Sequence, residues 1–353
     1  MDNRDAPLTI GPRRRRRLAA KYRRRRTFVA VAAILVIAAP LTIAIVVHDL
    51  GANISSSALR AHDGADVPEK LTDETNVLII GSDTRDLASA QDDSGPASAS
   101  GYGSAEGARS DAMILAHIAA DGSRIDAVQI PRDTIMDIPA CDDTGRGATQ
   151  AVHGMINSAL NGGPACSVSA AETLTGVRVD HFINVDFDGF AAIVDALDGI
   201  TVDLDEPLKD PKANLDLPAG EQTIGGTDAL ALARTRHAVG DGSDISRMGN
   251  QQMVMNAIID RAKSSHVLTR PDRLYSFLDA VTSSLEVDDD LDSVSSLASL
   301  ATTAAAVPKD DITFGIMPWT PAPEDPNRVV KSSQADEVFA AINADEPITD
   351  LVN

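Results

Sequence analysis

The chain is 353 residues long, which is enough for a large core and one to two domains. Its charge is uneven, because residues 1–26 hold 11 of the 31 Lys and Arg but 2 of the 52 acidic residues. The remainder has 20 basic and 50 acidic residues and would repel a nucleic acid, so we expect no nucleic-acid partner for the main domain.

An uncharged apolar run, FVAVAAILVIAAPLTIAIVV, follows the basic residues at 28–47. About 20 such residues span a bilayer, and basic flanks mark the cytoplasmic side. The pattern predicts a cytoplasmic basic tail at 1–27, a transmembrane helix at 28–47 and an extracytoplasmic linker at 48–74. A cleaved signal peptide is the alternative, although its apolar region is usually only about 7–15 residues long. We therefore expect a single-pass protein of the cell membrane, with a cytoplasmic N-terminus and an external main domain.

Three apolar strands with charged ends are predicted next, in NVLIIGSDTRD (76–86), RSDAMILAHI (109–118) and RIDAVQIPRD (124–133). The Asp-Gly pair at 121–122 predicts a hairpin between the second and third strands. The Ser-, Gly- and Ala-rich residues 89–108 are predicted to form a loop that could act as a lid. Strand ends are common sites of chemistry in α/β sheets, so the candidate residues here are Asp83, Arg85, Arg109, Asp111 and Arg132.

The rest of the chain alternates between helical and strand patterns. Short helices are expected at 155–159 and 167–174, then a strand in VDHFINVDFDGF, a helix with apolar residues at 190, 193, 194 and 197, and a strand in GITVDL. Further helices are expected at 274–285 and 335–342, with a strand in ITFGIMPW before the second. This alternation is typical of a layered α/β domain.

The only two cysteines, Cys141 and Cys166, lie in the part expected outside the membrane. A disulfide between them is the natural pairing in an oxidising compartment, and two buried free thiols are the alternative. The sequence has no CxxC or HExxH motif, so it does not support a zinc site. The scattered His153, His181 and His237 have no Ser or Cys at a nucleophile motif, which favours structural roles for them.

Residues 231–252, ALARTRHAVGDGSDISRMGNQQ, concentrate arginine and amide side chains. Because Arg234 and Arg236 are two apart, where helix neighbours diverge, a helix is expected to end there. On the helix expected after the glycine-rich turn, Arg247 and Gln251 share a face near the N-terminus, where backbone N–H groups favour an anion. The stretch therefore predicts an anion site, with surface ion pairs as the alternative.

Together these motifs resemble the LytR-CpsA-Psr family of cell-envelope glycopolymer phosphotransferases. In order they are GSDTRD, RSDAMIL, IPRD, INSALNGG, FDGFAAIVDALDGI, LPAGEQTIGGTDALALARTRH and the segment 247–252. The resemblance implies a catalytic domain at 75–345 with its motifs at 75–263, a tail at 346–353, and a three-layer α/β/α fold around a central mixed sheet. It also implies an apolar groove for a polyprenyl chain, with a charged mouth for its pyrophosphate.

The resemblance carries roles to individual residues. It makes Asp83 and Asp111 the metal ligands, for Mg²⁺ or alternatively Mn²⁺, with either one a candidate base. Asn250 stands where relatives often have Arg, so no charged role is carried to it. The implied catalytic residues are Asp83, Asp111, Arg132, Arg234 and Arg236, and the implied pyrophosphate-binding residues are Arg85, Arg109, Arg132, Arg234, Arg236, Arg247 and Gln251.

The implied function is transfer of a glycopolymer from a polyprenyl-pyrophosphate carrier to a peptidoglycan hydroxyl, forming a phosphodiester. The composition and the Cys pair look actinobacterial, which favours arabinogalactan as the donor polymer, with teichoic acid or capsule as alternatives. A pyrophosphatase acting on the same carrier would use the same residues. A regulatory or non-catalytic binding protein is the third possibility, and the acidic, external main domain counts against a DNA-binding regulator.

Overall fold

The computed structural model describes residues 38, 40–42, 44–61, 67–82, 109–235, 244–264 and 270–352, without the side chains of 244–247. The chain divides into two compact units, Met1–Ala52 and Asn53–Asn353. Residues 44–52 are helical, but the predicted tail at 1–27 and half or more of the predicted transmembrane segment lie outside the described residues. Within the described ranges, no helix combines the length and apolar character needed to cross a membrane.

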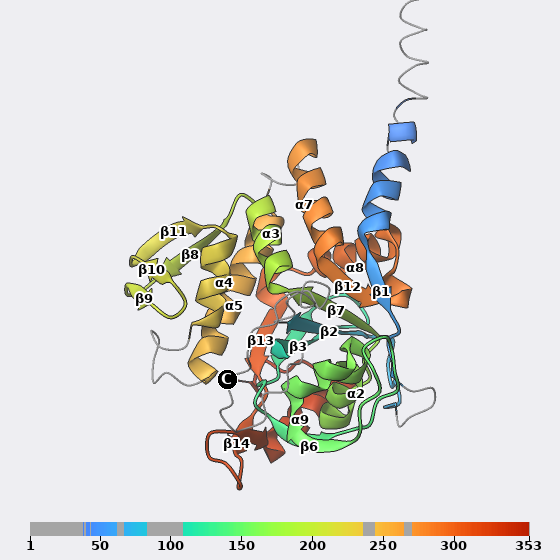
Figure 1. The fold of residues 1–353 in the computed structure, drawn as a ribbon, viewed down its shortest axis with the longest axis vertical. Helices are drawn as coiled ribbons and strands as arrows, with labels where there is room; N and C mark the ends of the chain where they lie inside the picture. The colour runs from blue at the N-terminus through green and yellow to red at the C-terminus, as the bar shows by residue number, and fades with distance from the viewer. Residues whose placement is uncertain are drawn as a thin grey trace, which may run out of the picture. The chain divides into compact units, whose positions relative to one another are not determined.

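A seven-stranded sheet is the centre of the second unit (Figure 1). Three neighbouring pairs are parallel and three are antiparallel, so the sheet is mixed. The three predicted strands with charged ends are present, and Gly122 in the hairpin between two of them has a φ of 67°. The strands in sheet order are β1 (Ser55–Ser57), β12 (Leu285–Asp288), β7 (His181–Asp186), β2 (Thr75–Ser82), β3 (Ser110–Ile118), β4 (Ile125–Gln129) and β13 (Ile312–Ile316).

Alternate residues of β2 point to opposite faces of the sheet, as the pleat requires. Leu78 and Ile80 are fully buried in the main core, which includes residues of α2 (Pro164–Thr175) and α9 (Ser333–Asn343). Ile79 and Gly81 face the opposite side of the sheet, toward the helical residues 187–190, 230–234 and 251–255. Figure 1 shows α2 and α9 on one side of the sheet and α3 (Phe187–Ala196) and α7 (Pro271–Ser284) on the other. The predicted α/β class with a mixed central sheet is confirmed.

A second core lies beside the sheet and supports the helices of its other face. It joins apolar residues of α3 (Phe187–Ala196), α4 (Gly226–Arg234) and α5 (Asp244–Ala262) to two small hairpins. The predicted GITVDL strand is present as β8 (Ile200–Leu204), and among the described strands it pairs with β11 (Gly220–Ile224) and not with the central sheet. The hairpins are β8 (Ile200–Leu204) with β11 (Gly220–Ile224), and β9 (Leu208–Asp210) with β10 (Leu215–Leu217).

Other elements complete the second unit. The predicted helical pattern at 274–285 is α7 (Pro271–Ser284), and the strand β12 begins directly after it. The sulfur atoms of Cys141 and Cys166 form a disulfide that links the start of α2 to the segment after β5 (Ile135–Ile138). The remaining elements are β5 (Ile135–Ile138), β6 (Val152–Met155), the 3-10 helices η1 (Ile156–Gly162), η2 (Asp289–Leu291) and η3 (Lys309–Asp311), α8 (Val294–Ala306), β14 (Trp319–Pro321) and β15 (Val329–Lys331).

Two segments outside the range 75–345 contribute to the sheet and core of the second unit. Strand β1 falls inside the predicted linker at 48–74 and pairs in parallel with β12. Ile348, in the predicted tail, is fully buried in the main core. The three serines of β1 lack the alternating apolar residues that predict a strand. A single isoleucine in a short segment shows no hydrophobic periodicity either, so the local sequence predicts neither contact.

Helix α3 packs closely against both of its neighbours at glycines of the sequence motifs. A Cβ atom on Gly189 would lie 2.6 Å from the Cβ atom of Ser284 in α7. A Cβ atom on Gly226 would lie 2.7 Å from the carbonyl carbon of Ala191 in α3. The carboxylate of Asp195 also accepts a hydrogen bond from the Gly226 N–H at 2.7 Å. These contacts fix the position of α3, and with it the aromatic residues at its start.

We expect Gly226→Ala to lower the free energy of unfolding by about 2 kcal/mol, because overpacking a well-packed contact typically costs about 1–3 kcal/mol. The added methyl group would meet the backbone of Ala191, which no side-chain rotation can relieve. Gly249→Ala is the matched control, since its Cβ would meet nothing within 4 Å on α5 and should stabilise by roughly 0.5–1 kcal/mol. Urea unfolding of both variants tests this, and equal effects would contradict the close α3–α4 contact.

Candidate functional site

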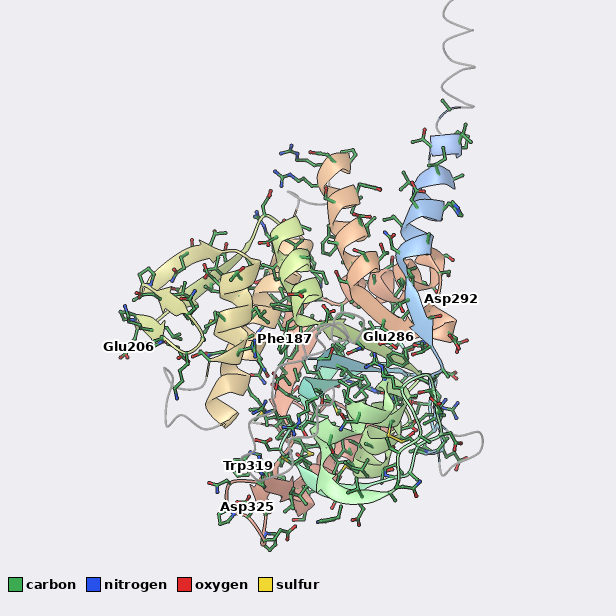
Figure 2. All side chains as sticks on the ribbon, viewed as in Figure 1. Phe187, Glu206, Glu286, Asp292, Trp319 and Asp325 are labelled. Carbon is green, nitrogen blue, oxygen red and sulfur yellow. A yellow bond between two sulfur atoms is a disulfide. The ribbon has the colours of Figure 1, made fainter. Side chains whose placement is uncertain are left out.

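An apolar cavity lies between the sheet and helices α3, α4 and α5, with about 720 Å³ of empty space that is partly open to solvent. Most side chains that line it are apolar, including those of Ile79, Ile114, Phe187, Phe190, Leu230 and Val254. Four polar side chains also line it, those of Asp111, Asp186, Arg234 and Gln251. Figure 2 labels Phe187 at the start of α3. The cavity therefore combines an apolar wall with a few polar groups, as ligand sites commonly do.

Asp111 and Arg132 form an ion pair at this cavity. The register of the β3–β4 hairpin explains why these two residues are neighbours. Ile114 pairs with Gln129, and Asp111 and Arg132 each lie three residues farther from the hairpin turn than these two. Asn157, from the INSALNGG motif, donates its backbone N–H to the Arg132 carbonyl at 3.3 Å. Both charged side chains keep about a sixth of their surface exposed, 17% for Asp111 and 16% for Arg132. The pair is thus held in place and partly exposed to solvent.

Gln251, in the second turn of α5, connects that helix to the same edge of the sheet. Its side-chain oxygen accepts a hydrogen bond from the side-chain amide of Gln129, the last residue of β4. Gln129 is 4% exposed and stands three residues before Arg132. No sequence motif predicted Gln129 as a site residue, although a polar residue at the end of an apolar strand is a signal for one.

Arg234 is the last residue of α4, and its guanidinium carbon lies 4.3 Å from the centre of the Phe187 ring. The predicted helix end is present, because Thr235 leaves the helix with a ψ of 138° and bonds through its hydroxyl to the buried Asp210. Stacking on an aromatic ring holds a guanidinium by a cation–π interaction while its N–H groups remain available. Phe187 is therefore a site residue, although the sequence showed only that a helix begins near it.

Of the remaining predicted site residues, the structure describes the side chain of Arg109 alone. Arg109 is exposed directly before β3 and does not line the cavity. Arg247 lies on α5, but its side chain is outside the described part of the chain. Asp83, Arg85 and Arg236 are also outside it. Of the predicted site residues, the structure brings together Asp111, Arg132, Arg234 and Gln251.

A divalent metal remains an expectation for this site. Among the described residues, no group of three or more His, Cys, Asp or Glu could hold a metal ion. The Asp186 carboxylate caps the N-terminus of α3, where it accepts a hydrogen bond from the Gly189 N–H at 2.7 Å. Asp111 offers a hard oxygen at the cavity and fits Mg²⁺, which is usually bound by one or two carboxylates together with substrate phosphates and waters.

His153 and His181 do not line the cavity. His181 hydrogen-bonds the buried Asp288 carboxylate at 3.1 Å, and this bond raises the pKa of His181. His153 lies between Asp137 and Glu324 in the exposed β5–β6 region, and hydrogen bonds to both raise its pKa. His237 is outside the described residues. Neither His153 nor His181 has a hydrogen bond to a Ser or Cys side chain in the described part of the chain.

The fold and site define an α/β protein with an apolar cavity that ends at an arginine–carboxylate pair. The sequence model of the LytR_cpsA_psr family matches residues 46–343, and the chain belongs to this family. It is 31% identical over 267 residues to the cell wall biosynthesis protein LcpA of Corynebacterium glutamicum, covering 70% of this chain and 50% of that protein. It is 28% identical over 232 residues to the polyisoprenyl-teichoic acid–peptidoglycan teichoic acid transferase TagU of Oceanobacillus iheyensis, covering 65% of this chain and 63% of that protein.

The chain thus spans about half the length of LcpA and less than two thirds of TagU. Among solved structures, the LytR-Csp2A-Psr enzyme from Actinomyces oris matches with a TM-score of 0.60 and 22% identity. That match covers 81% of this chain and 96% of the other, and it supports the fold.

Proposed function

We propose that this protein is a phosphotransferase of the cell envelope that moves a glycopolymer from a polyprenyl-pyrophosphate carrier to a peptidoglycan hydroxyl. The observation that carries the proposal is the Asp111–Arg132 pair at the edge of an apolar cavity. The apolar wall suits the polyprenyl chain, and the charged groups suit the pyrophosphate. The name of TagU describes a transfer of this kind, and arabinogalactan is the donor that we propose for this chain.

The reaction joins the acceptor hydroxyl oxygen to the glycan-bearing phosphorus and breaks the bond from that phosphorus to the bridging oxygen. Polyprenyl phosphate leaves with the electron pair of the broken bond, and the hydroxyl proton passes to a base, for which Asp111 is a candidate. The guanidinium groups of Arg132 and Arg234 bind phosphoryl oxygens in a forked geometry and stabilise the charge that develops there. Mg²⁺ held by Asp111 and Asp83 would neutralise further phosphate charge when bound.

Product analysis tests the transfer against simple hydrolysis of the carrier. The full-length protein is given a polyprenyl-pyrophosphate-linked arabinogalactan donor, peptidoglycan and Mg²⁺. We expect the labelled glycan to appear on the peptidoglycan through a phosphodiester bond. Release of free glycan phosphate with no labelled peptidoglycan would make the protein a pyrophosphatase. A teichoic-acid-linked donor, run in parallel, tests the choice of polymer.

The proposed location is the cell membrane, with residues 1–27 in the cytoplasm, 28–47 across the bilayer and the catalytic domain outside. Basic residues flank the apolar run only on its N-terminal side, which favours this orientation. We expect protease added to intact, wall-stripped cells to degrade the main domain and leave an N-terminal epitope tag protected. A main domain that is digested only after cell lysis would reverse the orientation.

A further inference from the structure

A second pocket borders another face of α5, with about 790 Å³ of empty space that includes open solvent. It is bounded by the end of β13, by β14 and by the first turn of α9. The side chains that matter for its chemistry are those of Gln252, Phe314, Met317, Pro318, Trp319 and Gln334.

The lining of this pocket combines an exposed aromatic ring with neutral amides. Trp319 is the single Trp of the chain and keeps 37% of its surface exposed, and Figure 2 shows it on β14. In the described part of the structure, the side-chain amides of Gln252 and Gln334 make no hydrogen bond. No charged side chain is among the described lining residues, although the chain carries a formal net charge of -21.

These groups match one ligand chemistry, that of a sugar ring. A glutamine amide both donates and accepts hydrogen bonds, as each sugar hydroxyl does. The electron-rich face of an indole attracts the weakly positive C–H groups on one face of a sugar, as it attracts the edge of another aromatic ring. No charged side chain among the described lining residues would balance the charge of an ion, which favours a neutral ligand.

The pocket adjoins the candidate active site through α5 and β4. Gln251 lines the apolar cavity and Gln252 lines this pocket, because successive residues of a helix with about 3.6 residues per turn point in different directions. The Met317 N–H donates to the Gln129 carbonyl at 2.9 Å, and the Gln129 side chain donates to Gln251. A chain of sugars that begins at the Asp111–Arg132 edge therefore has this pocket beside it.

The geometry points to a saccharide-binding subsite at Trp319, Gln252 and Gln334, which holds a sugar ring of a glycan that takes part in the transfer. Its role in the reaction rests on the proposed function, whereas its binding of a saccharide does not. Two sources share this chemistry, the glycan of the donor and the glycan of the peptidoglycan acceptor.

Intrinsic fluorescence of the full-length protein tests the subsite, because Trp319 is its only tryptophan. A soluble arabinogalactan oligosaccharide represents the donor glycan, and an N-acetylglucosamine oligomer represents the peptidoglycan glycan. We expect at least one of them to change the emission in a saturable way and to reduce quenching of Trp319 by acrylamide. The oligosaccharide that does so identifies the source. Unchanged emission and quenching with both would overturn the subsite, even if the protein proves to be a transferase.

Variants then locate the binding. Gln334 is exposed in the first turn of α9, so Gln334→Ala should fold normally and weaken binding about threefold to tenfold, the worth of one or two lost hydrogen bonds. Gln150→Ala removes an exposed amide outside the pocket and should leave the affinity unchanged. Trp319→Ala has no fluorescence signal, so its binding is measured by calorimetry and should be lost. Unchanged affinity in both pocket variants would place the saccharide elsewhere and overturn the assignment.

Discussion

Arg132→Lys should reduce glycopolymer transfer at least about tenfold, which corresponds to about 1.4 kcal/mol of transition-state stabilisation, while leaving the melting temperature nearly unchanged. Lysine keeps the positive charge beside Asp111 but cannot bind two phosphoryl oxygens in a fork. An arginine that served only as a surface ion-pair partner would tolerate the change, since such pairs contribute about 0–1 kcal/mol. Transfer rates at saturating and limiting donor, measured beside thermal unfolding, decide between these roles.

Arg273→Lys is the matched control for that experiment. Arg273 pairs with Asp198 at the surface, and its side chain is 34% exposed. We expect this variant to transfer at the rate of the parent protein. Asp111→Asn should lose at least as much transfer as Arg132→Lys, and the double variant should be little worse than either, because the two groups serve the same phosphoryl-transfer step. Normal transfer by Arg132→Lys would remove the pyrophosphate from this edge of the sheet.

Ala233→Phe should raise the KM for a donor with a long polyprenyl chain at least about tenfold, because the new ring displaces lipid from the apolar cavity. Ala233 lines that cavity from α4 and is partly exposed there. Each buried CH₂ group contributes about 0.8 kcal/mol, so losing the contacts of two such groups is equivalent to about tenfold in affinity. A donor with a short, water-soluble lipid does not need the cavity and should keep its KM. Transfer assays with the two donors provide the comparison.

The control for added volume is Ala305→Phe, at an exposed position of α8 outside the cavity. It should change neither KM. If Ala233→Phe raised the KM for both donors equally, the ring would be disturbing the phosphate end of the site. The assignment of the cavity to the polyprenyl chain would then be wrong.

Much of the central sheet and part of the site followed from local sequence patterns. Apolar runs predicted β2, β3 and β4, and the Asp-Gly pair at 121–122 predicted the hairpin. A hairpin centred on that pair places Asp111 opposite Arg132, so the sequence contained the geometry of the ion pair. The end of α4 at Arg234 was also predicted, because alternating arginines and the glycines after them do not continue a helix. Each of these features depends on neighbouring residues, which a local pattern can describe.

Only the tertiary structure decided which distant segments meet. Gln129 and Gln251 are 122 residues apart in the chain, and their hydrogen bond depends on how α5 packs against the end of β4. Phe187 joins the site because α3 and α4 cross at Gly226, where a side chain would strike the Ala191 backbone. Packing across the fold also brings Gln252 and Gln334 to Trp319. Such contacts leave no periodic signal in the sequence, because each is set by the shape of the whole core and not by the residues beside it.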